Sequence, residues 1–184
     1  MNRRLIICAF FALLLSPCGA QQKMRDVFLQ MPDSLLPYLT EHNRLDFIDF
    51  IDSNMKAEVT NELEGKSEML LLDDKSLVLR VSSSMQIAMQ LMPVSEVVDS
   101  CQQVVCMITT YGIDTPESKV EIYSLKWRIL DVASHLALPS SPYVADFLPS
   151  STGLIVKESN ALDMIANEEQ EKVTSWLKNI EWKP

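Results

Sequence analysis

The stretch that decides this fold is Val104–Trp127, VVCMITTYGIDTPESKVEIYSLKW. It contains two runs rich in β-branched and aromatic residues, Val104–Tyr111 and Val120–Trp127, separated by the segment GIDTPES. Such runs, when bounded by Gly, Pro, Asp and Ser, are typical of two strands in an antiparallel hairpin. The first run has apolar residues or threonine on both faces, and a strand without a polar face is usually covered on both sides. The stretch therefore predicts a hairpin in the middle of a sheet.

Further strands are predicted before this hairpin. Met69–Leu72 and Leu77–Val81 lie on either side of Asp73-Asp74-Lys75-Ser76, a pattern that indicates a tight hairpin. Between residues 85 and 91, apolar residues alternate with glutamine and alanine, which predicts a strand with one buried face and Gln90 on its outer face.

The pattern after the hairpin is weaker. The segment LPSSPYVADFLPSS is rich in proline and serine, so we expect a loop with a short turn of helix at Tyr143–Leu148. Leu154–Val156 and Ala161–Ala166 are candidate strands, and Ile180–Trp182 is predicted to close the chain as a short strand.

Two amphipathic helices are predicted, one near each end of the chain. The N-terminal helix is expected over Asn43–Asn54, with Asn43 as its N-cap and Leu45, Ile48 and Ile51 on its apolar face. The C-terminal helix is expected over Asn167–Lys178, with acids in its first turn and a lysine in its last. The predicted fold class is therefore α+β: a curved, mostly antiparallel sheet of six or more strands, packed by these two helices.

The first twenty residues have the pattern of an export signal. Arg3 and Arg4 precede the apolar run Leu5–Leu15, and Cys18-Gly19-Ala20 supplies small residues at a cleavage site. We expect cleavage after Ala20, which leaves residues 21–184 as a single domain. The alternative is a lipoprotein anchored through Cys18, although the proline before this cysteine fits that pattern poorly. Either reading predicts an exported protein, periplasmic or secreted, without a transmembrane span in the mature chain.

The chain is acidic, with a net charge of −9. Removal of residues 1–20 takes away two arginines and no acid, which leaves 14 basic and 25 acidic residues and a net charge of −11. Such a surface repels nucleic acid and anionic membranes, so no nucleic-acid partner is expected.

Two cysteines remain after cleavage, Cys101 and Cys106, at a spacing of C-x4-C. A disulfide between them would close a small loop in an oxidising compartment. The alternative is that Cys106, which lies within a predicted strand, serves as a small core hydrophobe. Neither histidine nor a second cysteine pair completes a zinc site.

The sequence yields no catalytic, cofactor-binding or metal-binding residues. Ser134 and His135 are neighbours, and adjacent residues do not supply the geometry of a nucleophile and its base. The other candidates have structural explanations: His42 as an isolated histidine, Asp46, Asp49 and Asp52 as a solvated helix face, Asp73/Asp74 and Glu168/Glu169 as turn or helix-start acids, and Met85, Met89 and Met92 as core residues rather than copper ligands.

Four segments resemble an uncharacterised family of exported proteins typical of Bacteroidales. They are MPDSLLPYLTEHNRLDFIDFID, KAEVTNELEGKSEMLLLDDKSLVLRVS, VVCMITTYGIDTPESKVEIYSLKWRIL and EEQEKVTSWLKNIEWKP. The resemblance covers most of residues 22–184. It implies an exported α+β domain and supplies no catalytic or binding residue.

These observations lead to two hypotheses on function. The first is a non-enzymatic envelope or secreted binding module whose partner is an extracellular or envelope protein or a glycan. The second is a carboxylate-dependent hydrolase of glycan or peptide. A cleft lined by acids with raised pKa values would favour the hydrolase, whereas an exposed apolar patch or a free sheet edge would favour the binding module.

Overall fold

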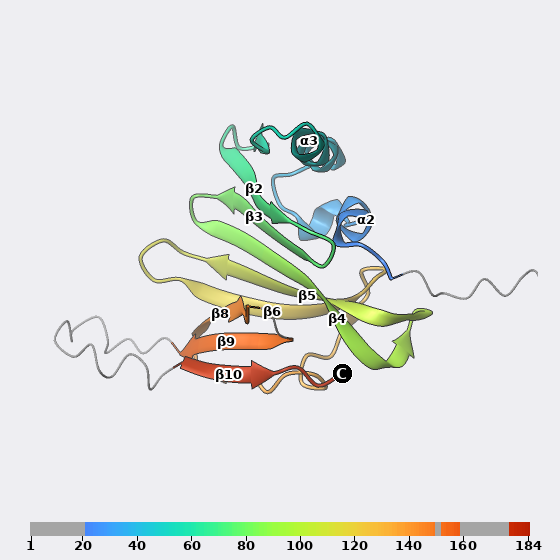
Figure 1. Cartoon of the computed structure of the whole chain (residues 1–184). Helices are drawn as coiled ribbons and strands as arrows, with labels where there is room; N and C mark the ends of the chain where they lie inside the picture. Colours follow the sequence, from blue (N-terminus) through green and yellow to red (C-terminus); the bar gives the residue numbers. More distant parts are fainter. Residues whose placement is uncertain (1–20, 150–151, 159–176) are drawn as a thin grey trace, which may run out of the picture.

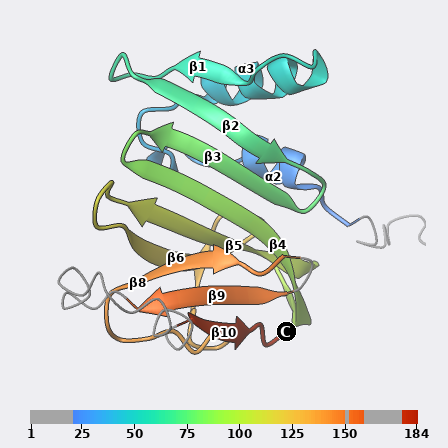
Figure 2. The same ribbon diagram turned by 60° about the vertical axis from the view of Figure 1, so that its left-hand side comes forward.

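The computed structural model describes residues 21–149, 152–158 and 177–184. A seven-stranded antiparallel sheet forms the middle of the molecule, with helices on one face and a three-stranded antiparallel sheet on the other (Figures 1 and 2). Two hydrophobic clusters fill the spaces between these layers, one on each face of the large sheet. The α+β class and the antiparallel sheet are therefore confirmed.

The large sheet is a meander, because its strands are neighbours in the order in which they occur along the chain. The helical elements are α2 (Met24–Leu29), the 3-10 helix η1 (Asp33–Leu35) and α3 (Glu41–Asp52). The large sheet consists of β1 (Glu58–Thr60), β2 (Lys66–Leu72), β3 (Ser76–Ser82), β4 (Met85–Val98), β5 (Cys101–Tyr111), β6 (Glu117–Ser124) and β7 (Ile129–Leu130). The small sheet consists of β8 (Tyr143–Phe147), β9 (Gly153–Glu158) and β10 (Leu177–Glu181), in the order β10-β9-β8.

The predicted central hairpin is present as β5 and β6, which pair antiparallel with Ile108 opposite Val120. At its turn, Gly112 has φ +97°, and a Cβ there would meet the carbonyl oxygen of Thr115 at 2.6 Å. Only glycine accommodates this close approach without strain. On β5, Val105 and Met107 face the helices while Cys106 and Ile108 face the small sheet, so the prediction that both faces are covered is confirmed.

The predicted hairpin of β2 and β3 is also confirmed, as is a strand beginning at Met85. However, β4 is buried on both faces along much of its length, because the small sheet covers Ala88, Met92 and Val94. The expectation of one buried face was wrong because the alternating positions contain glutamine and alanine, and alanine is small enough to lie beneath a second layer. A two-residue turn, in which Asp99 and Ser100 both have positive φ, joins β4 to β5.

Helix α3 begins and ends about two residues earlier than expected. Its N-cap is Thr40, not Asn43, whose side chain instead completes a reciprocal capping box with Thr40. The buried face also differs from the prediction, because Phe47 and Ile48 are buried while Leu45 is 44% exposed. The buried stripe is centred on Phe47 and Ile48, and Phe50 and Ile51 pack partly buried against the same cluster.

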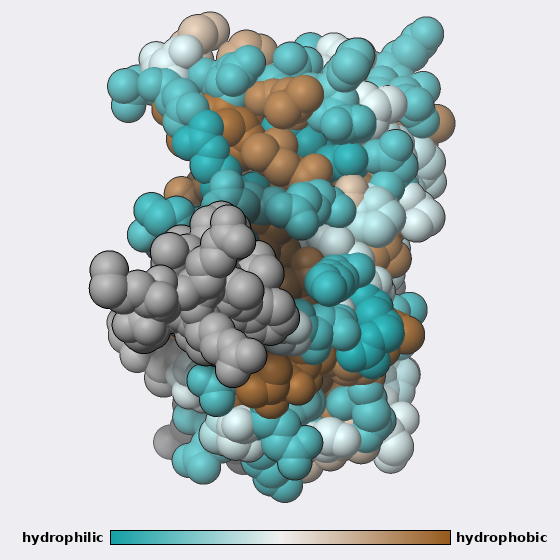
Figure 3. All heavy atoms as spheres, turned by 90° about the vertical axis from the view of Figure 1, so that its right-hand side faces the viewer, coloured by the Kyte–Doolittle hydropathy of each residue, from teal (hydrophilic) through white to brown (hydrophobic). Residues whose placement is uncertain are grey.

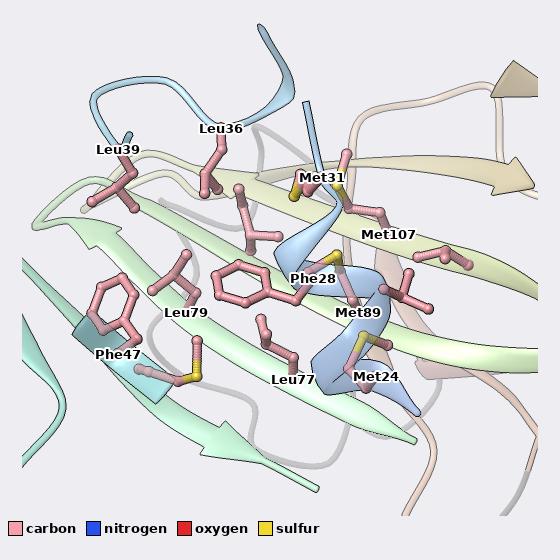
Figure 4. Packing of buried hydrophobic residues seen from close by; sticks show 14 of the residues in the cluster. Met24, Phe28, Met31, Leu36, Leu39, Phe47, Leu77, Leu79, Met89 and Met107 are labelled. Atoms are coloured by element: carbon pink, nitrogen blue, oxygen red, sulfur yellow. The ribbon is translucent and has the colours of Figure 1, made fainter. Parts of the chain in front are cut away.

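Helix α2 was not predicted, since its six residues carry too few turns for a clear helical period. It nevertheless supplies Met24 and Phe28, which are fully buried. Figure 4 shows Phe28 over the sheet among Leu79, Leu77 and Met89. This short segment therefore holds much of the helix-side core.

The C-terminal part of the prediction requires correction. Tyr143–Phe147 is strand β8 and not a turn of helix, and Leu177 and Lys178 belong to strand β10 and not to the end of a helix. In the described chain, the second layer over the sheet is thus β-structure. Both segments form strands because they pair with β9, which is distant in the chain. At Tyr143–Phe147 the proline- and serine-rich context had favoured a loop. The predicted strand at Leu154–Val156 is confirmed as part of β9. Three other predictions lie outside the described residues: the remainder of the helix at Asn167–Lys178, the strand at Ala161–Ala166 and the export signal at residues 1–20.

The structure forms no disulfide between Cys101 and Cys106. Five positions along a strand place two side chains on opposite faces and about 17 Å apart. Accordingly, Cys101 packs against the helix-side cluster and Cys106 lies in the small-sheet cluster. Cys106 is the core hydrophobe of the second interpretation, and burial raises the pKa of its thiol to about 12.

Candidate ligand cavity

A cavity of about 580 Å³ opens at the end of the large sheet where β3 begins and β4 extends beyond it. Small-molecule sites typically have volumes of roughly 300–1,000 Å³. Figure 3 looks at the molecule from this side and shows a hollow near its centre. We call this the amide cavity, and its lining residues are Gln21, Lys75, Gln90, Leu91, Pro93, Gln103 and Thr152.

The cavity exists because β3 and β4 differ in length. The pairing of β3 with β4 starts at Ser76, opposite Gln90, and the next backbone N–H of β4, that of Leu91, donates to the carbonyl of Lys75. Beyond this point β4 has no partner on that side within the described chain. Pro93 removes one N–H from this edge, which is a common way of preventing further strand pairing.

The C-terminal segment covers part of the same edge. The indole Nε1 of Trp182 donates to the carbonyl of Pro93 at 2.6 Å, and Ser95 Oγ donates to the carbonyl of Pro184 at 3.0 Å. Trp182 is buried in the small-sheet cluster. The small sheet is thus fixed to the edge of β4 beside the cavity.

Two glutamines on neighbouring strands line the cavity, and they lie on opposite faces of the large sheet, Gln103 on the helix side and Gln90 on the small-sheet side. The backbone N–H of Gln22 donates to Oε1 of Gln103 at 3.2 Å, which leaves the amide NH₂ of Gln103 as a donor. Oε1 of Gln90 is buried and has no hydrogen-bond partner. Gln90 lies opposite Cys106, so this oxygen is buried on the small-sheet face of β4 and is not exposed to the cavity.

The charge of the cavity is opposite to that of the protein as a whole. Among the described lining residues Lys75 alone is charged, and no described residue forms an ion pair with it. Of the neighbouring acids, Asp74 pairs with Lys23 at 3.1 Å, and Asp73 accepts from the backbone N–H groups of Lys75 and Ser76. The described lining therefore carries one positive charge and several hydrogen-bond donors, while Asp73 and Asp74 lie outside the lining in the adjoining turn.

A second cavity, of about 410 Å³, contains the neighbours Ser134 and His135. Ser134 Oγ donates to Asp131 at 2.7 Å, and the Ser134 hydrogen bond is the main cause of a lowered Asp131 pKa. The ring of His135 bonds through Nδ1 to the carbonyl of Lys183 at 2.8 Å and stacks on Trp182. The histidine therefore anchors the C-terminal segment and does not contact the serine hydroxyl as a base would.

The other residues considered from the sequence are not gathered into a site. Asp46, Asp49 and Asp52 lie exposed along α3, and Asp52 pairs with Arg25. Met85 and Met89 face the helices while Met92 faces the small sheet, as their spacing predicted. In the described ranges no group of three potential ligands could hold a metal ion. The remaining candidates are Asp73 and Asp74, which occupy the β2–β3 turn, and His42, which is exposed. Glu168 and Glu169 lie outside the described residues.

Hydrogen bonds lower the pKa values of five described carboxyl groups. In each case the main cause is a hydrogen bond from a basic or hydroxyl side chain. These groups are Asp52, Glu58, Asp99, Asp131 and Glu158. A carboxyl that donates a proton near neutral pH requires the opposite shift.

Strand β2 also has an exposed edge. β1 pairs only with Lys66, Ser67 and Glu68, and the leucines beyond them, Leu70 and Leu71, are 43% and 45% exposed. A free edge with apolar side chains was the feature expected of a binding module. The edge is short and has a bulge between Met69 and Leu71, so the amide cavity is the better-defined site.

Sequence reasoning did not identify the amide cavity. Gln90 and Gln103 lie 13 positions apart, and Gln90 had been placed on an outer face. The available signals were a proline inside a strand pattern, Pro93, and polar glutamines within apolar β-runs. Only the unequal lengths of the strands bring these residues together with Lys75.

The architecture defines an α+β class of protein, in which a seven-stranded antiparallel meander lies between helices and a small sheet. A solved structure has the same fold, described as "Structure of a domain of an uncharacterized protein from Porphyromonas gingivalis W83". Its TM-score is 0.66 at 19% sequence identity, and the match covers 86% of this chain and 91% of that chain.

Residues 18–164 match the model of a family described as "Protein of unknown function (DUF3256)", and the chain belongs to this family. The resemblance to an uncharacterised family of Bacteroidales is thereby confirmed. No match was found among curated proteins. Within residues 21–149, 152–158 and 177–184, the helices are all too short or too polar to cross a membrane.

Proposed function

We propose that this protein is an exported binding module that carries out no reaction and recognises an envelope or extracellular protein or a glycan. The observation that carries the proposal is the amide cavity. It has the volume of a ligand site, and its lining residues carry carboxamide, hydroxyl and ammonium groups. Such groups select a ligand through hydrogen bonds.

No specific observation favours the hydrolase. A glycosidase of the usual kind needs two carboxylates across the reacting bond, one of them with a raised pKa. The described residues that line the amide cavity include no carboxylate, and the second cavity contains Glu96 and Asp131, the latter with a lowered pKa. The arrangement is suited to holding a ligand more than to transferring a proton.

Export is the part of the proposal that rests on the N-terminal sequence. The charged start, the apolar run and the small residues before Gln21 support cleavage after Ala20. N-terminal sequencing of protein recovered outside the cytoplasm should begin at Gln21, either free or cyclised. A start at an acylated Cys18 would establish the lipoprotein form, and an intact Met1 in the cytoplasm would refute export.

Binding is tested by capture from envelope extracts and on a glycan array, with wild type and two matched variants. Gln103→Leu removes an amide that lines the cavity, whereas Gln102→Leu changes its exposed neighbour outside the lining. We expect a bound protein or glycan that is retained by Gln102→Leu and lost in Gln103→Leu. Equal capture by both variants, or by none of the three proteins, would contradict a binding role for the cavity.

A further inference from the structure

We infer that the amide cavity binds a small molecule that carries a carboxylate on a polar frame rich in hydrogen-bond acceptors. This inference rests on the proposed binding function and specifies its ligand. It follows from two features of the cavity: an excess of donors, and a cation without an ion-pair partner among the described residues.

The donors outnumber the acceptors. Oε1 of Gln103 is already used by the backbone N–H of Gln22, so Gln103 offers its NH₂ group. The ammonium of Lys75 has three N–H donors and no acceptor. Thr152 adds a hydroxyl. A ligand with several acceptor oxygens would complement this set.

The cation indicates that one of these acceptors is charged. Lys23 pairs with Asp74, and Lys75 has no ion pair with a described residue. Among the described lining residues there is no carboxylate that would neutralise Lys75. Charge-assisted hydrogen bonds are roughly twice as strong as neutral ones, so a ligand carboxylate gains more from this site than a hydroxyl does.

Gln90 does not define the ligand, because its side chain lies on the small-sheet face of β4, opposite Cys106, and its Oε1 is buried there. Leu91 and Pro93 supply the apolar part of the cavity wall.

Two sources supply this chemistry: an acidic sugar such as a uronic acid, and the C-terminal end of a peptide. The probes are digalacturonic acid and N-acetyl-Ala-Ala, each tested against a neutral counterpart of the same size, galactobiose and N-acetyl-Ala-Ala amide. Calorimetry or NMR titration is carried out on the purified protein with the N-terminus that sequencing has established.

We expect at least one carboxylate probe to bind, and its neutral counterpart to bind about tenfold more weakly. Lys75→Met should remove about the same factor, while Lys126→Met, an exposed lysine outside the lining, should change nothing. Gln103→Leu should weaken binding and Gln102→Leu should not. Binding of only one probe identifies the source.

The inference is overturned if neutral probes bind as well as acidic ones, if Lys75→Met leaves the affinity unchanged, or if neither carboxylate binds at millimolar concentration. If these results are obtained but Gln103→Leu still abolishes capture of an envelope partner, only the ligand class is refuted and the proposed binding function remains supported. If capture also fails, both the ligand class and the binding function are refuted.

Discussion

The two faces of the large sheet are packed by different kinds of side chain. The helix side is filled by long, unbranched or aromatic residues such as Met24, Phe28 and Met89, whereas the small-sheet side is filled by β-branched and small residues such as Ile122 and Val156. Helices on a sheet leave irregular gaps, which flexible methionines fill well. Two sheets approach to about 10 Å, a spacing that suits short branched side chains.

The difference shows that each face of the large sheet is covered by a different part of the chain. Helices α2 and α3 immediately precede the first strands, so the helix-side core is assembled from neighbouring segments. The small sheet follows the whole meander, and its last strand and Trp182 return to the edge of β4. Four experiments test this contrast.

The largest effect is expected from the reactivity of Cys106, on the small-sheet face. Burial raises the pKa of its thiol from 9.0 to about 12, so the reactive thiolate at pH 8 is roughly a thousandfold rarer than in the unfolded chain. Alkylation followed by mass spectrometry should modify Cys106 only after unfolding in urea. Rapid labelling in the native protein would mean that the small sheet does not close this face.

The next effect tests the helix side. Phe28→Ala removes a fully buried ring from α2 and should lower the free energy of unfolding by about 3–5 kcal/mol. Phe50→Ala, at a partly buried position on α3, is the matched control and should cost less. The measurement is urea unfolding at constant pH, with midpoints compared at equal slope. Equal losses would show that α2 is not the anchor of this layer.

On the small-sheet face, Ile108→Ala and Ile122→Ala should each cost about 2–5 kcal/mol, because both side chains are at most 2% exposed in the central hairpin. The control is Lys119→Ala on the same hairpin, where loss of the ion pair with Glu121 should change stability by about 0.5 kcal/mol. If the isoleucine variants unfold no earlier than the lysine variant, the hairpin is peripheral to the core.

The smallest effect compares one tryptophan on each face. Nε1 of Trp182 donates to the carbonyl of Pro93 at 2.6 Å, and Nε1 of Trp127 donates to that of Val27 at 3.3 Å. Replacement of either by phenylalanine should cost about 1 kcal/mol, with the larger loss at Trp182, whose bond is shorter. Hydrogen exchange should report local opening of β10 in Trp182→Phe. Opening of the helix side instead would reverse the assignment of faces.

The sequence by itself determined the local features of this protein. The β-branched runs and the turn residues between them defined the hairpins β2–β3 and β5–β6, because side-chain period and turn chemistry act over only a few residues. The two apolar faces of β5 also indicated burial on both sides. The absence of familiar catalytic motifs directed attention to binding.

Tertiary structure decided the rest. Tyr143–Phe147 and Leu177–Glu181 are strands because β9 lies between them, and α2 is a helix in a segment with little helical period because Phe28 is buried against the sheet. The amide cavity likewise depends on β4 extending beyond β3, and its lining combines Lys75 with residues of β4 and β5. Such contacts join residues far apart in the chain, and their energies come from burial and pairing that no local pattern records.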